Sequence, residues 1–322
     1  MKFFVTGGNG FIGRRLVEQL SRQGHNLKVL SRHSDSILSS GVQAVRGDLT
    51  SDSHSLDKLV DGCEIIFHCA GEIRNEAAMK SLHVDGTQRL MDAVLKQAKL
   101  TGKAIHWVQL SSVGAYGPPA GAASSERIVT EDTLLQPVGE YEVTKTLSDK
   151  LIIEASEGDL ITYSIIRPSN VFGFGMPNES LFSLGEMVRR GLFFYIGKPG
   201  AIATYVHVSD VVEVLLRCCK DQRAKGEIFN ISNDCLLEEM INGIADAHGV
   251  DHPRFRLSEK LMRTVVKTVG KIVPLPLTDK RINAIVVRTK YPCDKLKQKL
   301  NFVPKVSVPS ALGEVVCLKD GK

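Results

Sequence analysis

The chain has 322 residues, of which 43% are hydrophobic and 24% are charged, and these proportions exclude a disordered or fibrous protein. At about 150 residues per domain, this length predicts two domains, or one large domain with an added lobe. The 41 basic and 36 acidic side chains give a formal net charge of +5 without dense basic blocks, so nucleic acid is not expected as a partner.

Short apolar runs and amphipathic stretches alternate in the first half of the chain. The candidate strands are Lys2 to Thr6, Leu27 to Ser31, Val42 to Arg46, Glu64 to Cys69, Ala104 to Leu110 and Leu160 to Arg167. The candidate helices are Phe11 to Gln23, Asp52 to Val60, Glu76 to Lys99 and Tyr141 to Glu157. This alternation predicts an α/β protein with a doubly wound parallel sheet and helices on both faces.

The alternation weakens after Pro168. A helix is predicted near Leu181 to Arg190, and the strand Ala203 to Val208 with the helix Asp210 to Cys219 should return to the sheet. From about Leu236 onward we expect a smaller lobe. The loop Gly114 to Gln136 is long enough to cover a ligand. The basic segment Leu257 to Arg288 suits a membrane surface, an anionic ligand or a solvated helix face.

No apolar run reaches the roughly 18 to 20 residues that a bilayer span needs. Met1 leads within one residue into Phe3, Phe4 and Val5, with no charged n-region or cleavage site. We therefore expect a cytoplasmic protein without a membrane span. The seven cysteines have no Cys-x-x-Cys spacing, and several lie in apolar stretches. This pattern indicates reduced packing thiols, and it predicts no metal site.

The motif GGNGFIG occupies residues 7–13, between the first predicted strand and the first predicted helix. Its glycines let the backbone approach a pyrophosphate closely, and the start of the helix offers unpaired N–H groups and a positive dipole end. At the first βα turn of a chain that continues as βαβ units, the motif predicts nucleotide binding rather than a merely structural turn.

The end of the second predicted strand carries Arg32 and no carboxylate. An acidic residue there would bind the ribose hydroxyls of NAD, whereas a guanidinium suits a 2′-phosphate. We therefore expect NADP to be favoured over NAD. Asp48 follows the third predicted strand, where its carboxylate could hold the adenine amino group or cap the next helix.

Tyr141 and Lys145 have the i, i+4 spacing that places two side chains on one face of a helix. Ser112 lies at the end of the fifth predicted strand, at the sheet edge where ligands of open α/β folds bind. A free tyrosine has a pKa of about 10, so a neighbouring ammonium is needed to favour its phenolate form. We predict that Ser112 hydrogen-bonds a reacting hydroxyl or carbonyl while Tyr141 moves the proton and a nicotinamide exchanges hydride.

Taken together, these features resemble the extended short-chain dehydrogenase/reductase family, and specifically its epimerase/dehydratase branch of nucleotide-sugar enzymes. The motifs follow one another along most of the chain: Thr6 to Gly13, His68 to Gly71, Val84 to Thr87, Ser111-Ser112 with Tyr116-Gly117, Tyr141-x-x-x-Lys145, Arg167 to Gly173 and Tyr205 to Asp210. We therefore identify the chain as a member of this family.

The resemblance implies a Rossmann domain of residues 1–170 plus about 203–233, a substrate-binding lobe of about 171–202 plus 234–322, and a homodimer. It implies a catalytic triad of Ser112, Tyr141 and Lys145. The implied contacts with NADP or NAD come from Gly7, Gly10, Phe11, Ile12, Gly13, Arg32, Asp48, Leu49, Cys69, Ala70, Gly71, Tyr141, Lys145 and Pro168. The implied substrate contacts come from Ser112, Asn170, Arg189 and Arg190.

Departures from the family pattern bear on the reaction. Val113-Gly114 stand where the family's 4,6-dehydratases carry an Asp-Glu pair, so dehydration is not expected. Ala203 stands where family epimerases usually carry a diphosphate-gripping Arg, and Arg189 and Arg190 are either substitutes for it or a solvated helix end. His83 replaces a usual Asn, which alters the hydrogen bonding near the nicotinamide but not the fold.

The favoured interpretation is an NAD(P)-dependent C4 epimerase or keto-reductase that acts on a nucleotide sugar. Arg32 and Ala203 leave open an NADPH-dependent carbonyl reductase or 3-hydroxy dehydrogenase of an apolar substrate, similar to the dihydroflavonol and steroid branches of the superfamily. A third interpretation is a catalytically silent NADP-binding regulator, which the intact set of Ser112, Tyr141 and Lys145 disfavours.

Overall fold

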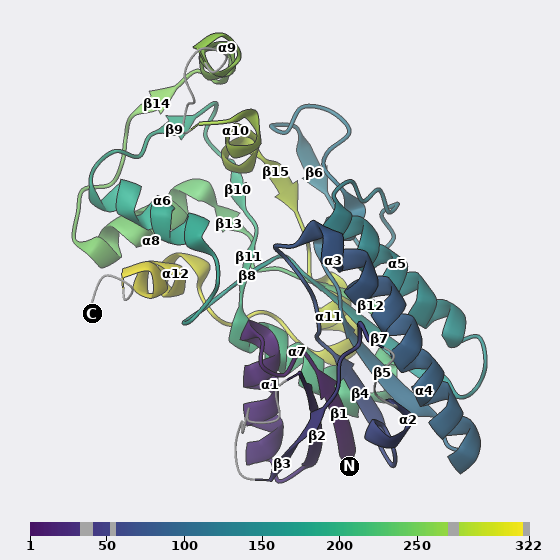
Figure 1. Ribbon diagram of the computed structural model, residues 1–322. Helices are drawn as coiled ribbons and strands as arrows, with labels where there is room; N and C mark the ends of the chain where they lie inside the picture. Colours follow the sequence, from purple (N-terminus) through teal and green to yellow (C-terminus); the bar gives the residue numbers. More distant parts are fainter. Residues whose placement is uncertain (33–40, 52–55, 270–276, 318–322) are drawn as a thin grey trace.

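The protein is described here by a computed structural model that covers residues 1–32, 41–51, 56–269 and 277–317 (Figure 1). Its centre is a seven-stranded sheet with every neighbouring pair parallel. In spatial order the strands are β12 (Glu227–Ile231), β7 (Ile161–Pro168), β5 (Ile105–Leu110), β4 (Ile65–His68), β1 (Lys2–Thr6), β2 (Asn26–Ser31) and β3 (Val42–Arg46). The order reverses direction between β1 and β4, so the predicted doubly wound α/β sheet is confirmed.

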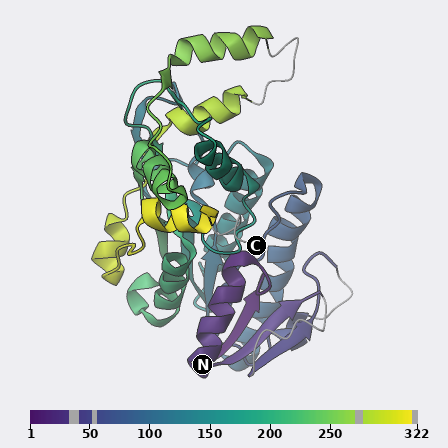
Figure 2. The ribbon, with the colours of Figure 1, turned by 90° about the vertical axis from the view of Figure 1, so that its left-hand side faces the viewer.

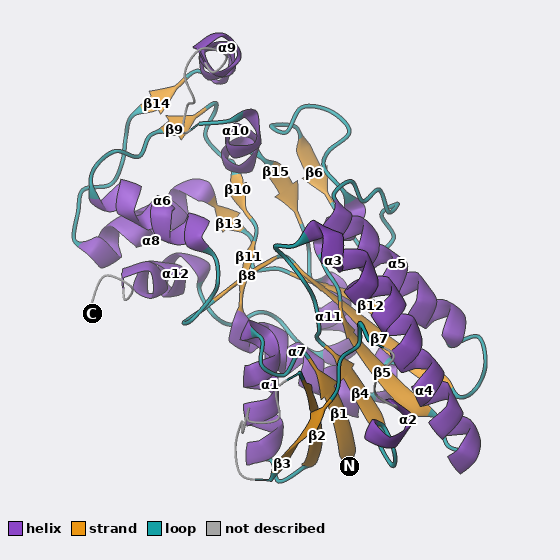
Figure 3. Cartoon of the chain, in the orientation of Figure 1, coloured by secondary structure: helices purple, strands orange, loops and turns teal. Residues whose placement is uncertain are grey.

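Helices cover both faces of the sheet (Figure 3). One face carries α1 (Phe11–Arg22), α7 (Val208–Lys220) and α11 (Asp294–Leu300), and the other carries α2 (Leu56–Leu59), α4 (Gly86–Thr101) and α5 (Glu140–Ala155). Successive strand residues point to opposite faces, so Phe3 and Val5 lie in the first layer and Phe4 in the second.

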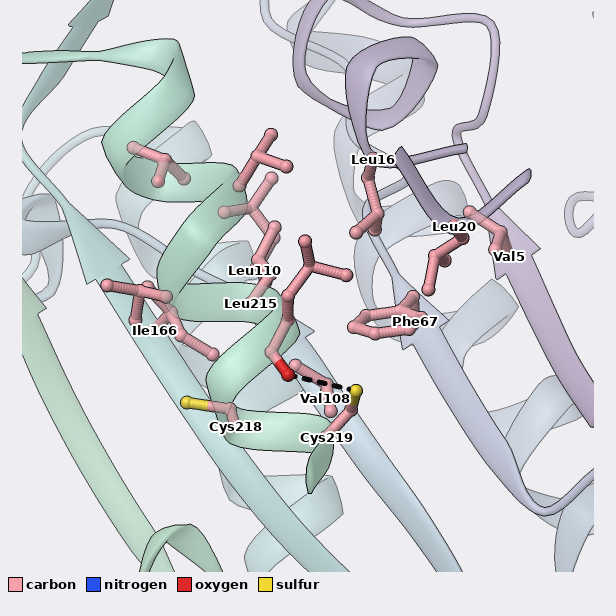
Figure 4. Close-up of a cluster of buried hydrophobic side chains, with 14 of the residues drawn as sticks. Val5, Leu16, Leu20, Phe67, Val108, Leu110, Ile166, Leu215, Cys218 and Cys219 are labelled. Carbon is pink, nitrogen blue, oxygen red and sulfur yellow. Dashed lines mark hydrogen bonds between the residues drawn. The ribbon is translucent and has the colours of Figure 1, made fainter. Parts of the chain in front are cut away.

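The first layer is a hydrophobic core, which Figure 4 shows in close-up. Val5 and Phe67 from neighbouring strands meet Leu16 of α1 and Leu215 of α7. The thiol of Cys219 donates a hydrogen bond to the carbonyl oxygen of Leu216 at 3.1 Å. All seven cysteines lie among the described residues and are free thiols.

Two predicted elements differ from the structure, and a third lies partly outside the described residues. The expected strand Ala203 to Val208 does not join the main sheet, because β11 (Tyr205–His207) pairs with β8 (Asn170–Phe172) and β12 takes the place beside β7. The expected helix Glu76 to Lys99 is divided into α3 (Glu76–Lys80), the π-helix η1 (Ser81–Asp85) and α4. Of the expected helix Asp52 to Val60, residues 52–55 lie outside the described residues.

A lobe of helices and short strands lies over the carboxyl ends of the sheet strands (Figure 1, Figure 2). Its helices are α6 (Glu179–Arg189), α8 (Leu237–His248), α9 (Glu259–Val269), α10 (Asp279–Val286) and α12 (Val308–Cys317). The further strand pairs are β10 (Ile202–Ala203) with β13 (Cys235–Leu236), β9 (Tyr195–Ile196) with β14 (Arg256–Leu257), and β6 (Glu126–Ile128) with β15 (Arg288–Lys290). Within the basic segment Leu257 to Arg288, residues 270–276 lie outside the described residues.

The C-terminal part of the chain returns to the sheet. Leu296, Leu300 and Phe302 are buried in the same core layer as Val5, and Lys299 pairs with Glu227 of β12 at 2.7 Å. The division into residues 1–170 plus about 203–233 and residues 171–202 plus 234–322 stays a prediction.

Candidate active site

The glycine-rich loop turns from β1 into α1 at the carboxyl edge of the sheet. Gly7 has a φ of +67°, and a Cβ there would lie 2.6 Å from the backbone nitrogen of Ala70. A Cβ on Gly13 would lie 2.1 Å from the carbonyl oxygen of Gly7. Gly10 has no side-chain cap, and the first turn of α1 holds no acidic residue. The N-terminal dipole of α1 is therefore left uncompensated within the helix, which suits a cofactor pyrophosphate.

Phe11 and Ile12 begin α1 and are half-buried. Phe11 packs against the core of the sheet and also against the core of the lobe. Residues predicted to contact the cofactor thus lie where the two parts of the molecule meet.

The residues predicted to surround the adenosine lie at the ends of β2 and β3. Asn9 of the glycine loop donates to Ser31 Oγ at 3.3 Å, and Arg32 follows as an exposed side chain. Asp48 Oδ1 accepts hydrogen bonds from the backbone nitrogen and the hydroxyl of Thr50, each at 2.8 Å. Asp48 therefore caps a turn, and the next residue, Leu49, is buried.

The segment after β4 is held by a buried chain of hydrogen bonds. The backbone nitrogen of Ala70 donates to Thr6 Oγ1 at 3.2 Å, and this hydroxyl lies 2.7 Å from His68 Nδ1. On the other side of the ring, His68 Nε2 lies 3.0 Å from Thr87 Oγ1. Burial holds the pKa of His68 well below its ordinary value, so the imidazole is neutral. Cys69 and Ala70 are half-buried behind this chain, and Gly71 is exposed.

Tyr141 and Lys145 occupy successive turns at the start of α5, as their spacing predicted. Tyr141 is half-buried and Lys145 is only 4% exposed. Burial, together with the nearby carboxylates of Glu142 and Asp149, raises the pKa of Tyr141 to about 12. Burial also lowers the pKa of Lys145, while the charge of Asp149 offsets part of that lowering.

Asp149 lies one turn beyond Lys145 and anchors a buried polar cluster. Its Oδ2 accepts from Ser111 Oγ at 2.7 Å and from Arg167 Nε and Nη2 at 3.2 and 3.1 Å. Arg167 Nη1 also donates to the Tyr116 hydroxyl, at 3.1 Å. Sequence reasoning missed Asp149, although its i+4 position after Lys145 was a usable signal.

Ser112 caps the short 3₁₀ helix η2 (Val113–Tyr116), which packs against α5. Its Oγ accepts a hydrogen bond from the backbone nitrogen of Gly114 at 3.0 Å. A Cβ on Gly114 would lie 2.6 Å from Glu142 Cγ, so Glu142 fills the space where a side chain at 114 would begin. The three predicted catalytic residues therefore lie on two elements that pack against each other.

The predicted substrate contacts are divided between two places. Asn170, at the start of β8, is exposed and donates to the carbonyl oxygen of Thr204 at 3.0 Å. Arg189 and Arg190 lie at the exposed end of α6, and both donate to Glu186. Pro168 is buried at the end of β7.

A cavity of about 610 Å³ lies between the loop after η2 and the helices α9 and α10. Its lining includes the small or apolar residues Gly117, Pro118, Ala122 and Val287, the polar residue Thr204, and the cations Arg127, Arg263 and Lys280. The Arg127 guanidinium donates to the carbonyl oxygens of Tyr116 and Gly117 at 2.9 and 2.7 Å. Arg263 pairs with Glu259 and Asp279. Both guanidiniums are thus already engaged by groups of the protein itself.

Within the part of the chain that the structure describes, no helix is both long and apolar enough to cross a bilayer. In the same residues, no group of three or more His, Cys, Asp or Glu side chains is arranged to hold a metal ion.

The fold and the site define a dinucleotide-binding enzyme of the extended short-chain dehydrogenase/reductase type. The model of the NAD dependent epimerase/dehydratase family matches residues 3–232, and the chain belongs to that family. The resemblance drawn from the sequence motifs is therefore confirmed.

Relatives and solved structures differ in what their names describe. A 3beta-hydroxysteroid-dehydrogenase/decarboxylase (isoform 2) of Arabidopsis thaliana is 24% identical over 97% of this chain, and the chain spans only 61% of that protein. A UDP-N-acetyl-alpha-D-glucosaminuronate decarboxylase of Bacillus cytotoxicus is 25% identical over 97% of this chain and 95% of its own length. The structure of MoeE5 in complex with UDP-glucuronic acid and NAD has a TM-score of 0.75 at 22% identity, with both chains covered completely.

Proposed function

We propose that the protein interconverts a secondary hydroxyl group and a ketone, with NAD(P) as the hydride carrier and Ser112, Tyr141 and Lys145 as the reacting side chains. The observation that carries this proposal is the placement of Tyr141 and Lys145 on one face of α5, which packs against the helix capped by Ser112. The intact set favours an enzyme over a silent regulator.

Each side chain has a task that its surroundings support. When bound, NAD(P) accepts or supplies the hydride. Ser112 is the half-buried N-cap of η2, and its hydroxyl donates a hydrogen bond to the substrate oxygen. Tyr141 exchanges a proton with that oxygen. Because burial raises the pKa of Tyr141, the exchange depends on the positive charge of Lys145, and Asp149 helps to maintain that charge.

Two of the cations that line the cavity are already bound by the protein, which disfavours a diphosphate there. These two guanidiniums are held by carbonyl and carboxylate groups of the protein, and gripping a diphosphate would require breaking these contacts. Ala203 is buried in the core of the lobe at the position of the family's usual Arg. The name of the Arabidopsis relative describes a hydroxysteroid dehydrogenase, a reaction of this type. We propose a dehydrogenase or reductase of an apolar alcohol or ketone.

A nucleotide sugar is the second candidate substrate, as favoured by the sequence. Lys280 lines the cavity as an exposed cation, and Asn170 lies at the family position for substrate phosphate. The names of the Bacillus relative and of the MoeE5 complex describe UDP sugars. On this alternative the enzyme is an epimerase or keto-reductase of a sugar ring carbon.

NADP is the proposed cofactor on the basis of Arg32, which is exposed at the end of β2 where the 2′-phosphate would lie. The name of the MoeE5 complex includes NAD. The proposed preference for NADP depends on Arg32 at the end of β2, and titration of an Arg32 variant with both cofactors tests it.

Two measurements test the proposed function. Native mass spectrometry of the purified protein shows whether a cofactor is retained, as an epimerase requires, or exchanged, as a reductase requires. The protein is then incubated with NADPH or NADH and two panels: apolar ketones, including a 3-ketosteroid and a long-chain 3-oxo acid, and UDP-, GDP- and dTDP-sugars. Reduction of an apolar ketone is expected. Turnover of nucleotide sugars alone would favour the second candidate substrate. If no compound in either panel reacts, the proposal that the protein is an enzyme is wrong.

A further inference from the structure

His83 lies on the π-helix η1, between α3 and α4, and it touches both sides of the candidate site. Its Nε2 accepts a hydrogen bond from the backbone nitrogen of Glu72 at 2.8 Å. Its Nδ1 lies 2.8 Å from Thr144 Oγ1. The ring also meets the Tyr141 ring edge to face, with centroids 5.6 Å apart and an interplanar angle of 84°. The side chain is only 1% exposed.

These contacts permit one tautomer. Because Nε2 accepts from Glu72, the ring proton is on Nδ1, and Nδ1 donates to Thr144 Oγ1. The Thr144 hydroxyl in turn donates to the carbonyl oxygen of Glu140 at 2.7 Å. A second ring proton would place Nε2–H against the N–H of Glu72. Burial and the charge of Lys145 hold the pKa of His83 at about 4, so the neutral form is present at neutral pH.

The two ends of this bridge have different tasks. Glu72 follows the segment Cys69 to Gly71, which is a predicted cofactor contact after β4. Thr144 lies on α5 beside Lys145 and one turn from Glu140, in the stretch that carries Tyr141. The π-helix widens the backbone here and turns His83 toward α5, which packs against both α3 and η1.

We propose that His83 is a positioning residue that fixes the cofactor-side segment after β4 at a set distance from the catalytic helix α5. The inference rests on the proposed function. It adds that an imidazole, with an acceptor at one end and a donor at the other, spans a gap between the two elements. Tyr141 and the reacting end of the cofactor are then held at a fixed separation. Loss of either His83 hydrogen bond lets the two elements move relative to each other.

Three variants separate this role from mere packing. In His83→Asn the side-chain amide lies near the former Nδ1 and keeps the contact with Thr144, whereas in His83→Gln it lies near the former Nε2 and keeps the contact with Glu72. His83→Ala loses both contacts. The matched control is His106→Asn. His106 is also a buried histidine with a contact at each ring nitrogen, one to Thr162 and one to the carbonyl of Cys218. It lies near the amino end of β5, away from the carboxyl ends of the strands.

The first readout needs no substrate. Amide hydrogen exchange of the segment 70–75 should quicken about tenfold or more in His83→Ala and His83→Asn, which lose the acceptor for Glu72 N–H, and should stay unchanged in His83→Gln and His106→Asn. Calorimetric titration with NAD and NADP should show affinity lowered about tenfold in His83→Ala. An unchanged exchange rate in His83→Ala would overturn the bridge, whether or not a substrate is known.

The second readout is turnover on a substrate found with the panels above. If His83 is a bridge, kcat falls about tenfold or more in all three variants, because either broken end releases the geometry, while the KM for substrate changes little. If His83 only fills space, His83→Asn or His83→Gln restores kcat, and the proposal is wrong. Absence of turnover in the wild type contradicts the proposed function alone, since the exchange measurement still decides the bridge.

Discussion

Lys145 and Asp149 lie one helical turn apart on α5, and both side chains are almost completely buried. The carboxylate of Asp149 is shared between Arg167, at 3.1 Å, and the Ser111 hydroxyl, at 2.7 Å. One buried charge thereby joins Ser111, the residue before the predicted catalytic Ser112, to the helical turn after Lys145. The pKa of Lys145 therefore depends on a residue whose carboxylate is bound by Arg167 and Ser111.

Asp149→Asn should alter both pH dependence and stability. Burial lowers the pKa of Lys145, and removing the offsetting carboxylate lowers it further. Lys145 must be charged to assist Tyr141, so the alkaline limb of kcat/KM should shift to lower pH. Loss of one partner of a buried ion pair should also cost about 3–5 kcal/mol of unfolding free energy.

Glu213→Gln is the control for that variant. It removes the partly exposed partner of Arg217 on α7, and unfolding in urea should change by no more than about 1 kcal/mol. An alkaline limb at the same pH in Asp149→Asn and in the wild type would show that Asp149 does not set the charge of Lys145.

Tyr141→Phe should reduce turnover by about 10² to 10⁴, because it deletes the hydroxyl that transfers the proton. Lys145→Met should have a similar effect. Cofactor-dependent turnover is the measurement, and circular dichroism checks the fold. Tyr163→Phe is the matched control, since Tyr163 is a half-buried tyrosine on β7 that packs in the core behind the sheet. Near wild-type turnover in Tyr141→Phe would favour the silent regulator.

Arg32→Ala should weaken NADP binding about tenfold or more and leave NAD binding nearly unchanged, because a hydrogen bond to a charged phosphate contributes about 1.5–3 kcal/mol. Calorimetric titration measures both cofactors. Arg22→Ala is the control, since Arg22 lies at the other end of α1 from the glycine loop. Tighter binding of NAD than NADP by the wild type would contradict the proposed preference.

Gly13→Ala should impair cofactor binding and lower the free energy of unfolding by about 1–3 kcal/mol. The added Cβ would lie 2.1 Å from the carbonyl oxygen of Gly7, and a backbone atom cannot swing aside as a side-chain end can. Gly158→Ala is the matched control, because a Cβ there meets nothing within 4 Å. Equal effects of the two substitutions in urea unfolding would be inconsistent with this close packing.

No dehydration is expected from this site. Val113 and Gly114 stand where the family's 4,6-dehydratases carry an Asp-Glu pair. Gly114 has no side chain, and the side-chain stem of Glu142 from α5 fills the space beside it. With dTDP-glucose and either cofactor, NMR should detect no 4-keto-6-deoxy sugar. Appearance of that product would show that Glu142 or another acid performs the elimination.

The repeating part of the fold was predictable because each strand and helix carries its own periodic pattern. The sequence pattern did not predict that β12, and not the strand containing β11, would lie beside β7 in the sheet. Both are short apolar runs, and nothing in either pattern decides which one pairs with β7. That choice follows from the chain leaving β7 at Ser169 to form β8, which then pairs with β11.

The candidate site divides in the same way. The shared face of Tyr141 and Lys145 follows from helix geometry within five residues of sequence. The partners of His83 do not, since Thr144 is 61 residues away and the π-helix that turns His83 toward it has no recognisable pattern. Local spacing thus predicts the reacting groups, and tertiary contacts determine what holds them in place.

The return of α11 and Phe302 to the core layer of Val5 has a consequence for synthesis. A nascent chain that has emerged only as far as β12 still lacks Leu296, Leu300 and Phe302, so the strand edge and the adjacent core layer stay uncovered. Contacts between residues far apart in the sequence also slow folding, because a long loop must close before they form. The sheet and its helices should therefore acquire protease resistance only after Phe302 has left the ribosome.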